Sequence, residues 1–214
     1  MDPDVLIADA ELTIRRMRDD DTDCAYMVVW RNMQHVRRWW DPDLPPHTLE
    51  SVKEEHGPDT LPNATTTACI IEVQGIPTGF VQFYRWAPYA DEASEVGVLF
   101  DDLTYGLDIF IGDPSRINKG LGTRIVRLLS DYLIDDRSAS AVSLTTALDN
   151  HAAQRCYERA GFQKIKEVLD TDTYKGERVA SWLMTKEGSY KPVHVRLAEE
   201  GPKRGERDGA KDGP

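Results

Sequence analysis

The residues with the clearest chemical content lie between positions 105 and 135 of this 214-residue chain. The apolar run YGLDIFIG, typical of a buried strand, leads through a short loop into KGLGT at 119–123, and an amphipathic helix follows. The first turn of a helix leaves several backbone N–H groups without partners, and glycines there let a diphosphate approach without a Cβ in the way. This pattern indicates an anion-binding site. The alternative is a plain strand-to-helix turn that needs glycine only for its backbone angles.

Two other side chains have the chemistry of proton transfer. Asp108 lies inside the apolar run, where an unpaired carboxylate is costly to bury, so it needs a cationic partner or an opening. Its structural alternative is an ion pair with a nearby Arg or Lys. Tyr157 lies in RCYERAGF at 155–162, and a phenol hydroxyl can donate a proton or a hydrogen bond. Its structural alternative is packing on the amphipathic face of its helix.

These residues together resemble a known family. KGLGT, followed by a helix, a strand, Asn150 and RCYERAGF, is similar to the GCN5-related N-acetyltransferases. Within that family, Trp39-Trp40 and the sequence GLD at 106–108 resemble the aminoglycoside 6'-N-acetyltransferases. The resemblance extends over residues 12–185.

The resemblance implies an α+β fold with a central, mostly antiparallel twisted sheet, splayed at the acetyl-CoA site and flanked by helices. It also implies transfer of an acetyl group from acetyl-CoA to an amine of a cationic small molecule, an aminoglycoside, with CoA as the product. Two departures stand out. The family's loop motif begins with Gln or Arg where this chain has Ile117, and the chain lacks the aspartate that relatives carry near Thr145. The second departure puts the range of acceptors in question.

The resemblance also assigns roles to individual residues. Asp108 is expected to bind the reacting amine and receive its proton, and Tyr157 to donate a proton to the leaving thiolate. Contacts to acetyl-CoA are expected from the strand end, the loop and the helix that carries Tyr157: Ile109, Phe110, Ile111, Asn118, Lys119, Gly120, Leu121, Gly122, Thr123, Asn150, Ala153 and Tyr157. Contacts to the acceptor are expected from Trp40, His56, Gln82, Asp91 and Asp108.

In this assignment, the backbone of residues 109–111 faces the acetyl and pantetheine groups, where an N–H stabilises the developing oxyanion. For one of Trp39 and Trp40, ordinary core packing is the alternative. Transfer is expected to be direct, without an acetylated enzyme, because Cys156 would lie beside Tyr157 on a helix with no His positioned to activate its thiol.

Two other functions remain open at this point. The same machinery could acetylate a protein N-terminus or a small polyamine. A chain of this fold could also bind acyl-CoA as a sensor without turnover, although KGLGT, Asp108 and Tyr157 argue against it.

Composition narrows the partners. The net charge of −11 disfavours nucleic acid and favours a cationic partner, although negative charge also simply keeps proteins soluble. Apolar runs are too short to cross a bilayer, and the N-terminus lacks the pattern of a secretory signal, so we expect a cytoplasmic protein without membrane contact. The three cysteines, expected to be buried thiols, and the five histidines have no metal-ligand spacing, so no metal is expected. The sequence leaves monomer and homodimer open.

Hydrophobic periodicity predicts the elements that must position these residues. Strands are expected at 12–17, 66–73, 77–84, 105–112, 141–145 and 179–185. Helices are expected at 21–32, 48–56, after Gly120 and at 150–160, the last closed by Gly161. The apolar face of the first helix is expected at Ala25, Val28, Val29 and Met33, and residues 85–95 are expected to be irregular. Residues 1–187 are expected to form one acetyltransferase domain, and the charged residues 188–214 a disordered tail, because the last stretch has no apolar residue except one Ala.

Overall fold

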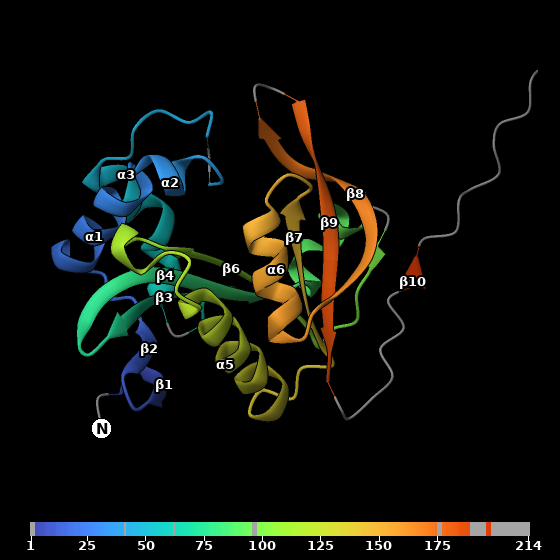
Figure 1. Cartoon of the computed structure of the whole chain (residues 1–214), viewed down its shortest axis with the longest axis horizontal. Helices are drawn as coiled ribbons and strands as arrows, with labels where there is room; N and C mark the ends of the chain where they lie inside the picture. Colours follow the sequence, from blue (N-terminus) through green and yellow to red (C-terminus); the bar gives the residue numbers. More distant parts are fainter. Residues whose placement is uncertain are drawn as a thin grey trace, which may run out of the picture.

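A computed structural model describes residues 3–40, 42–61, 63–95, 98–174, 177–188 and 196–197. An eight-stranded sheet in the order β1-β2-β3-β4-β6-β7-β9-β8 runs through the molecule (Figure 1). Its neighbouring strands are antiparallel except for β6 and β7, which are parallel. The expected α+β class with a mostly antiparallel sheet is confirmed.

The strands of this sheet are β1 Val5–Asp9, β2 Leu12–Arg16, β3 Thr66–Val73, β4 Ile76–Arg85, β6 Thr104–Ile111, β7 Ala141–Ala147, β8 Gln163–Tyr174 and β9 Glu177–Glu187. A second, two-stranded sheet pairs β5 Val98–Leu99 with β10 Arg196–Leu197. The α-helices are α1 Asp21–Arg31, α2 Gln34–Arg37, α3 Leu49–His56, α4 Ala90–Glu95, α5 Leu121–Asp135 and α6 His151–Ala160. Short 3-10 helices among the described residues span Pro58–Thr60, Ala87–Tyr89 and Pro114–Arg116.

Alternate residues of the central strands point to opposite faces of the sheet, and each face has its own core. In the first core, on one face, residues such as Val81 and Leu107 pack with Ile125 and Leu129 of α5. In the second core, on the other face, Phe80 packs with residues from α1, α2 and α3. The strand β6 therefore lies between two packed layers that hold both of its faces.

Local signals in the sequence fix several helix ends. The side chain of Asp20 accepts a hydrogen bond from the Asp23 amide and caps α1, and Thr48 forms a capping box with Ser51 at the start of α3. Gly161 ends α6 in the left-handed conformation, at φ 103°, as predicted.

Several described segments differ from the prediction. The helix α2 and the strands β1, β5, β8 and β10 were not expected, and residues 85–95, expected to be irregular, contain a 3-10 helix and α4. The buried face of α1 is formed by Cys24, Met27 and Trp30, whereas the expected face included Val29, which is 53% exposed.

The expected charged tail, residues 188–214, lies almost wholly outside the described residues, so its disorder stays a prediction. Its described part comprises Gly188 and β10, which pairs with β5 in the register Arg196 to Leu99 and Leu197 to Val98. Within the described part of the chain, no helix is long and apolar enough to span a membrane.

Candidate active site

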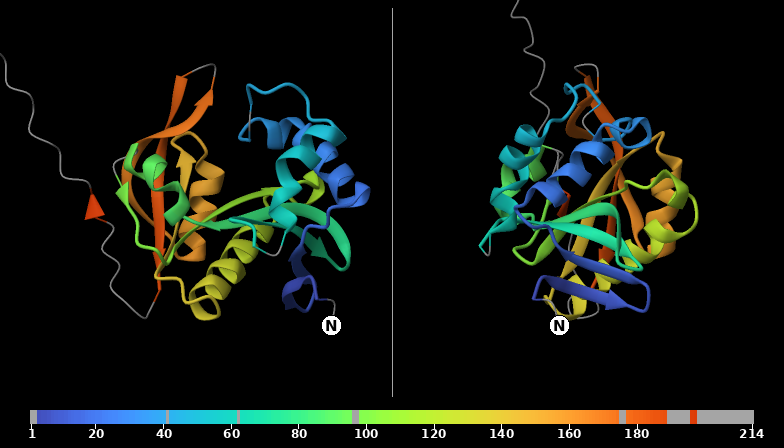
Figure 2. Two further views of the ribbon diagram at one scale, coloured as in Figure 1. Left: turned by 180° about the vertical axis from the view of Figure 1, so that it is seen from behind. Right: turned by 90° about the vertical axis from the view of Figure 1, so that its left-hand side faces the viewer.

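The sheet opens between β6 and β7. These parallel strands pair only at Thr104 with Ala141 and Tyr105 with Val142, whereas β6 stays paired with β4 as far as Ile111. In Figure 2, β7, β8 and β9 lie on one side of the molecule and β1 to β4 on the other. The sheet is therefore splayed beyond Tyr105.

The base of this opening is held by Asp101. Its carboxylate accepts hydrogen bonds from the hydroxyls of Ser140 at 2.6 Å and Thr104 at 2.8 Å, and from the amide of Leu103 at 3.0 Å. Burial alone would raise the pKa of Asp101, but these hydrogen bonds outweigh it and hold that pKa below its ordinary value. Asp101 thus ties the starts of β6 and β7 together.

Beyond the base, one edge of β6 has lost its neighbouring strand. The amide of Trp86 donates a hydrogen bond to the carbonyl of Thr104 at 3.0 Å, so these two residues form a hydrogen-bonded pair. Because such pairs alternate along antiparallel strands, the even-numbered residues of β6 direct their backbone N–H and C=O groups toward β4. The backbone N–H and C=O groups of Leu107 and Ile109 consequently point toward the side where β7 diverges. The backbone N–H and C=O groups of Phe110 point toward β4. Phe110 is 8% exposed, and its side chain packs in the second core.

The expected contacts at 109–111 are therefore not equivalent. Ile109 has its backbone on the open edge, and its half-buried side chain packs against the first core. The carbonyl of Ile111 accepts a hydrogen bond from His35 Nε2 at 3.0 Å. We keep Ile109 as a candidate coenzyme contact and leave Phe110 out, because its backbone and side chain face other parts of the protein.

The predicted anion-binding loop leads from β6 into α5. Asn118 and Gly120 have left-handed backbones, with φ of 60° and 80°, and Gly120 is the N-cap of α5. No side chain caps this helix, and its first turn contains no acidic residue. A Cβ built on Gly120 meets no atom within 4 Å, so the space beside the loop is open.

The remaining residues of the loop differ in exposure. Asn118, Lys119 and Gly120 are exposed, whereas Leu121, Gly122 and Thr123 are half-buried. A Cβ built on Gly122 would lie 3.3 Å from the sulfur of Cys156 on α6. Glycine at this position thus allows α5 and α6 to approach closely.

The start of α6 uses two of the expected coenzyme contacts in its own cap. The side-chain oxygen of Asn150 accepts a hydrogen bond from the amide of Ala153 at 3.2 Å. Ala153 is half-buried and packs against the first core. These contacts explain both residues structurally, and their predicted contact with acetyl-CoA stays a prediction.

Asp108 and Tyr157 come from the two sides of the opening. Gln82 Nε2 on β4 donates a hydrogen bond to Asp108 Oδ2 at 2.9 Å, and the two residues are cross-strand partners. Tyr157 on α6 is 8% exposed. Burial raises the pKa of Tyr157, and the charges of Cys156 and Asp108 raise it further. The charge of the Asp108 carboxylate therefore acts on the Tyr157 phenol, which stays protonated at neutral pH.

Of the other expected acceptor contacts, Trp40 lies on the same side of the sheet as Asp108. Its half-buried ring meets Phe110 edge-on, with ring centroids 5.1 Å apart, and Phe80 at 5.9 Å. Trp39 is 39% exposed, so the core-packing alternative does not describe it. Asp91 is exposed on α4.

His56 has a different position from the one expected. It is 2% exposed, its Nδ1 lies 3.4 Å from Asp59 Oδ2, and its ring packs on Phe80 at 5.1 Å. These contacts explain His56 structurally, and its predicted contact with an acceptor stays a prediction.

Residues 19–169 match the sequence profile of an acetyltransferase (GNAT) domain. The chain belongs to the GNAT acetyltransferases. Over 165 residues it is 31% identical to aminoglycoside N(6')-acetyltransferase type 1 of Klebsiella pneumoniae, a match that covers 75% of this chain and 78% of that protein.

Solved structures agree with this assignment. The GNAT chain matches aminoglycoside acetyltransferase AAC(6')-Ib in complex with coenzyme A and kanamycin with a TM-score of 0.68 and 28% identity, over 82% of this chain and 94% of that chain. It also matches spermidine N-acetyltransferase from Vibrio cholerae in complex with CoA and spermine, with a TM-score of 0.66 over 85% of this chain and 98% of that chain. At 17% identity this second likeness shows the fold alone.

The cysteines of this GNAT protein are not activated. Cys24 and Cys69 are buried, as expected, and Cys156 is half-buried. Burial raises the pKa of Cys156, against smaller opposing effects of a hydrogen bond with Thr123 and the charge of Arg159. Among the described residues, no three His, Cys, Asp or Glu side chains are grouped as metal ligands, and the absence of a metal stays a prediction.

Two parts of the GNAT site were not anticipated. The backbone of Leu107 shares the open edge with Ile109, and strand alternation alone would have indicated it. The role of Asp101 has no local signal, because its partner Ser140 is 39 positions away in the sequence.

Proposed function

We propose that this chain transfers the acetyl group of acetyl-CoA to an amino group of an aminoglycoside, the 6'-amine, and thereby confers resistance. The observation that carries the proposal is the splaying of β6 from β7 beside Asp108, together with a buried Tyr157 on α6 whose pKa the charge of Asp108 helps to raise. The acceptor class follows from the names of the relatives, aminoglycoside N(6')-acetyltransferases, and from the kanamycin complex of a similar structure.

The residues at the start of α5 fit the diphosphate of acetyl-CoA. The helix start lacks a side-chain cap and acidic residues, and Gly120 borders open space. The amides of Leu121, Gly122 and Thr123 are the donors that would bind the diphosphate, with Lys119 adding positive charge beside them. On the open edge of β6, the amide of Ile109 would donate to the thioester carbonyl, whose oxygen gains negative charge during transfer.

When bound, acetyl-CoA supplies an acetyl group activated as a thioester. Asp108, held by Gln82, would accept a hydrogen bond from the acceptor amine and receive its proton, directly or through water. Tyr157 would give its proton to the sulfur, because its raised pKa keeps the phenol protonated. One C–N bond forms and one C–S bond breaks, while nitrogen loses one proton and sulfur gains one.

We propose direct transfer within a ternary complex. A thiol whose pKa is raised by burial is a poor nucleophile at neutral pH, which argues against an acetylated Cys156. Initial-rate plots should give intersecting lines when both substrates are varied. Parallel lines would contradict direct transfer.

Thiol release from acetyl-CoA tests the proposed acceptor. Two aminoglycosides that differ only in a 6'-amine or a 6'-hydroxyl should give turnover with the amine alone. Turnover only with spermidine or an N-terminal peptide would establish a different acceptor. Binding of coenzyme A without thiol release in the presence of any amine would establish a sensor. A cytoplasmic location, the absence of nucleic-acid and membrane partners and the choice between monomer and homodimer stay predictions.

A further inference from the structure

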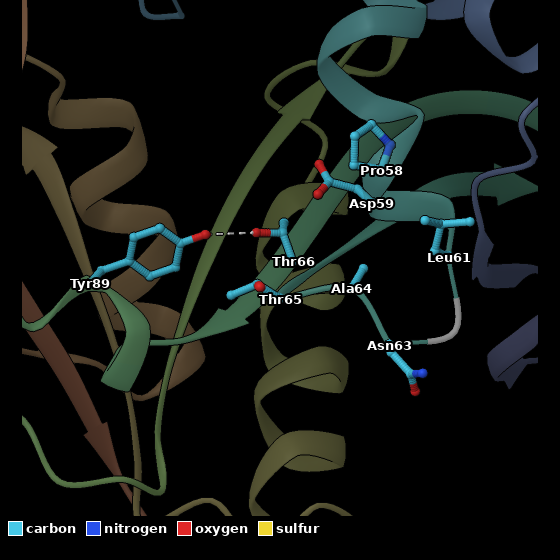
Figure 3. A pocket seen from close by; sticks show the side chains of 8 residues that line it. All are labelled: Pro58, Asp59, Leu61, Asn63, Ala64, Thr65, Thr66 and Tyr89. Atoms are coloured by element: carbon cyan, nitrogen blue, oxygen red, sulfur yellow. Dashed lines mark hydrogen bonds between the residues drawn. The ribbon is translucent and has the colours of Figure 1, made fainter.

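Two hollows open on opposite faces of the sheet. The one that Figure 3 shows from close by, lined in part by Tyr89, lies on the face of Asp108 beside the proposed acceptor site. The other, of about 520 Å³, lies on the face that α5 covers. We propose that this second hollow binds an organic phosphate monoester, with the phosphate group held between Arg85 and Arg137. The inference goes beyond the proposed function, because no residue that lines this hollow is assigned to acetyl transfer.

The second hollow lies where α5 ends. Residues from the start of β3, the end of β4 and the start of β6 line it, together with Asp136 and Arg137, which directly follow α5. Arg85 of β4 and Tyr105 of β6 are cross-strand partners on this face. The 15 residues of α5 span roughly 22 Å, so the length of this helix separates the hollow from the proposed diphosphate site at its other end.

Aromatic rings hold both arginines in place, and no carboxylate neutralises them. Arg85 donates a hydrogen bond from Nε to the hydroxyl of Tyr105 at 3.1 Å, and its guanidinium lies over that ring, 5.6 Å from the centroid. The guanidinium of Arg137 lies over the ring of Tyr132, 6.0 Å from the centroid. No described residue forms an ion pair with either arginine, and their terminal N–H groups donate to no described group. In a chain of net charge −11, two such arginines in one hollow indicate a bound anion.

The charges around the hollow select a small anion. The two guanidinium charges exceed the single carboxylate of the lining, Asp136, together with the charge of about −0.5 at the carbonyl end of α5. Asp102 acts on Arg85 from a greater distance. These negative charges and the net charge of the chain repel a polyanion such as nucleic acid. A phosphate monoester carries about two charges and accepts bidentate hydrogen bonds from guanidinium groups, so one monoester can bridge both arginines.

The rest of the hollow fits the organic part of such a ligand. Its volume lies in the range of small-molecule sites and exceeds what a phosphate group alone needs. Phe83 and Pro88 contribute apolar surface to the lining. The hydroxyls of Thr65 and Thr67, also in the lining, have no hydrogen-bond partner within the described part of the chain and are available to the ester oxygen.

Phenyl phosphate tests this site on the full chain saturated with coenzyme A, which fills the proposed diphosphate site. Titration of isotope-labelled protein should shift the backbone NMR signals of residues 85 and 137 with a Kd of about 1 mM or below, and inorganic phosphate should bind roughly tenfold more weakly. Arg85→Gln and Arg137→Gln should each raise the Kd for phenyl phosphate roughly tenfold, because each removes charge-assisted hydrogen bonds. Arg155→Gln removes the same charge from an exposed position of α6 outside the hollow and should leave this Kd unchanged.

The two variants separate binding from packing. Arg85→Gln loses the contact with Tyr105, whereas Arg137 follows α5 and belongs to no strand, so weaker binding in Arg137→Gln does not come from a disturbed sheet. The phosphate site is refuted if the signals of residues 85 and 137 do not move, if shifts are confined to residues 118–123, or if both variants bind as the wild type does. Equal binding of inorganic phosphate would refute a site for an organic ester. Thiol release assays acetyl transfer separately, so a failed titration leaves the proposed function standing, and a protein without transferase activity leaves this site standing.

Discussion

Replacing Tyr157 by phenylalanine removes the proposed acid while keeping the ring. The ring is 8% exposed and packs against Phe162 with centroids 6.0 Å apart, so the aromatic contact survives the change. The change removes no hydrogen bond between the described residues, so the variant should fold with nearly unchanged stability. Tyr157→Phe therefore separates chemistry from packing.

The size of the effect follows from the role. A positioned general acid contributes about 100-fold to 10,000-fold in rate, and a thiolate is a better leaving group than most, so we expect kcat to fall by roughly 100-fold. That loss corresponds to about 2.7 kcal/mol of transition-state stabilisation. Acetyl-CoA binding relies on α5 and β6 in the proposed site, so its KM should change by less than about threefold.

Thiol release under saturating acceptor measures this loss, with circular dichroism and coenzyme A titration as checks of folding and binding. Because the pKa of Tyr157 is raised above its ordinary value of 10.0, the wild-type rate should show no loss of this proton at neutral or mildly alkaline pH. An unchanged kcat in Tyr157→Phe would refute the acid role. A loss confined to the KM of acetyl-CoA would show that the hydroxyl only binds the coenzyme.

Other predictions concern the carboxylate, the loop and a buried thiol. Asp108→Asn keeps the shape of the side chain and its contact with Gln82 but removes the charge. In steady-state assays kcat/KM for kanamycin should therefore fall by at least about 100-fold. A wild-type rate at every pH would remove Asp108 from the mechanism. Gly120→Ala meets no neighbouring atom but forces alanine to φ 80°, so unfolding by urea should show a loss of about 1 kcal/mol, and KM for acetyl-CoA should rise severalfold; equal stability and KM would contradict the role of the loop. Complete burial raises the pKa of Cys69 from 9.0 to about 12, so the unfolded chain loses this proton first as the pH rises. The contribution of Cys69 to stability should be complete below pH 9.0 and decline toward about pH 12, and Cys69→Ala should show a shallower decline in thermal unfolding across that range; an equal slope would contradict it.

The central part of the fold was predictable because its strands are rich in β-branched and apolar residues and are bounded by turn residues. The expected strand at 66–73 has the observed bounds of β3, and the expected starts and ends of β4, β6 and β7 differ from the observed ones by at most two residues. Hydrophobic runs bounded by turn residues carry this information locally. The strand β8 was not predicted because its sequence is polar and it lies at the edge of the sheet, where Leu169 is 57% exposed.

The inward face of α1 shows where periodicity alone fails. The expected stripe includes Val29 and the half-buried Val28, which packs against the same core as Met27, and both stripes have helical spacing. Apolar character therefore does not distinguish the two stripes. Tertiary contacts decide, since Met27 and Trp30 face Phe80 and Phe110 while Val29 faces solvent. A single sequence gives no means of choosing between these stripes.

The candidate site was predictable as a set of residues but not as an arrangement. Asp108 and Gln82 were both expected, yet their hydrogen bond depends on the register of β4 with β6. The exclusion of Phe110 has the same origin, because register decides which backbone groups face the opening. The burial of His56 beside Asp59 was not predictable either, because it depends on how α3 docks on the sheet.

The short junction between β6 and β7 also sets how far the free ends of the two strands lie apart. A rotation of about ten degrees at Val142 would shift Ala147, five residues further along the strand, by roughly 3 Å. Substitutions near Asp101 or Thr104 can thus widen or narrow the space for an acceptor without touching any residue that contacts it.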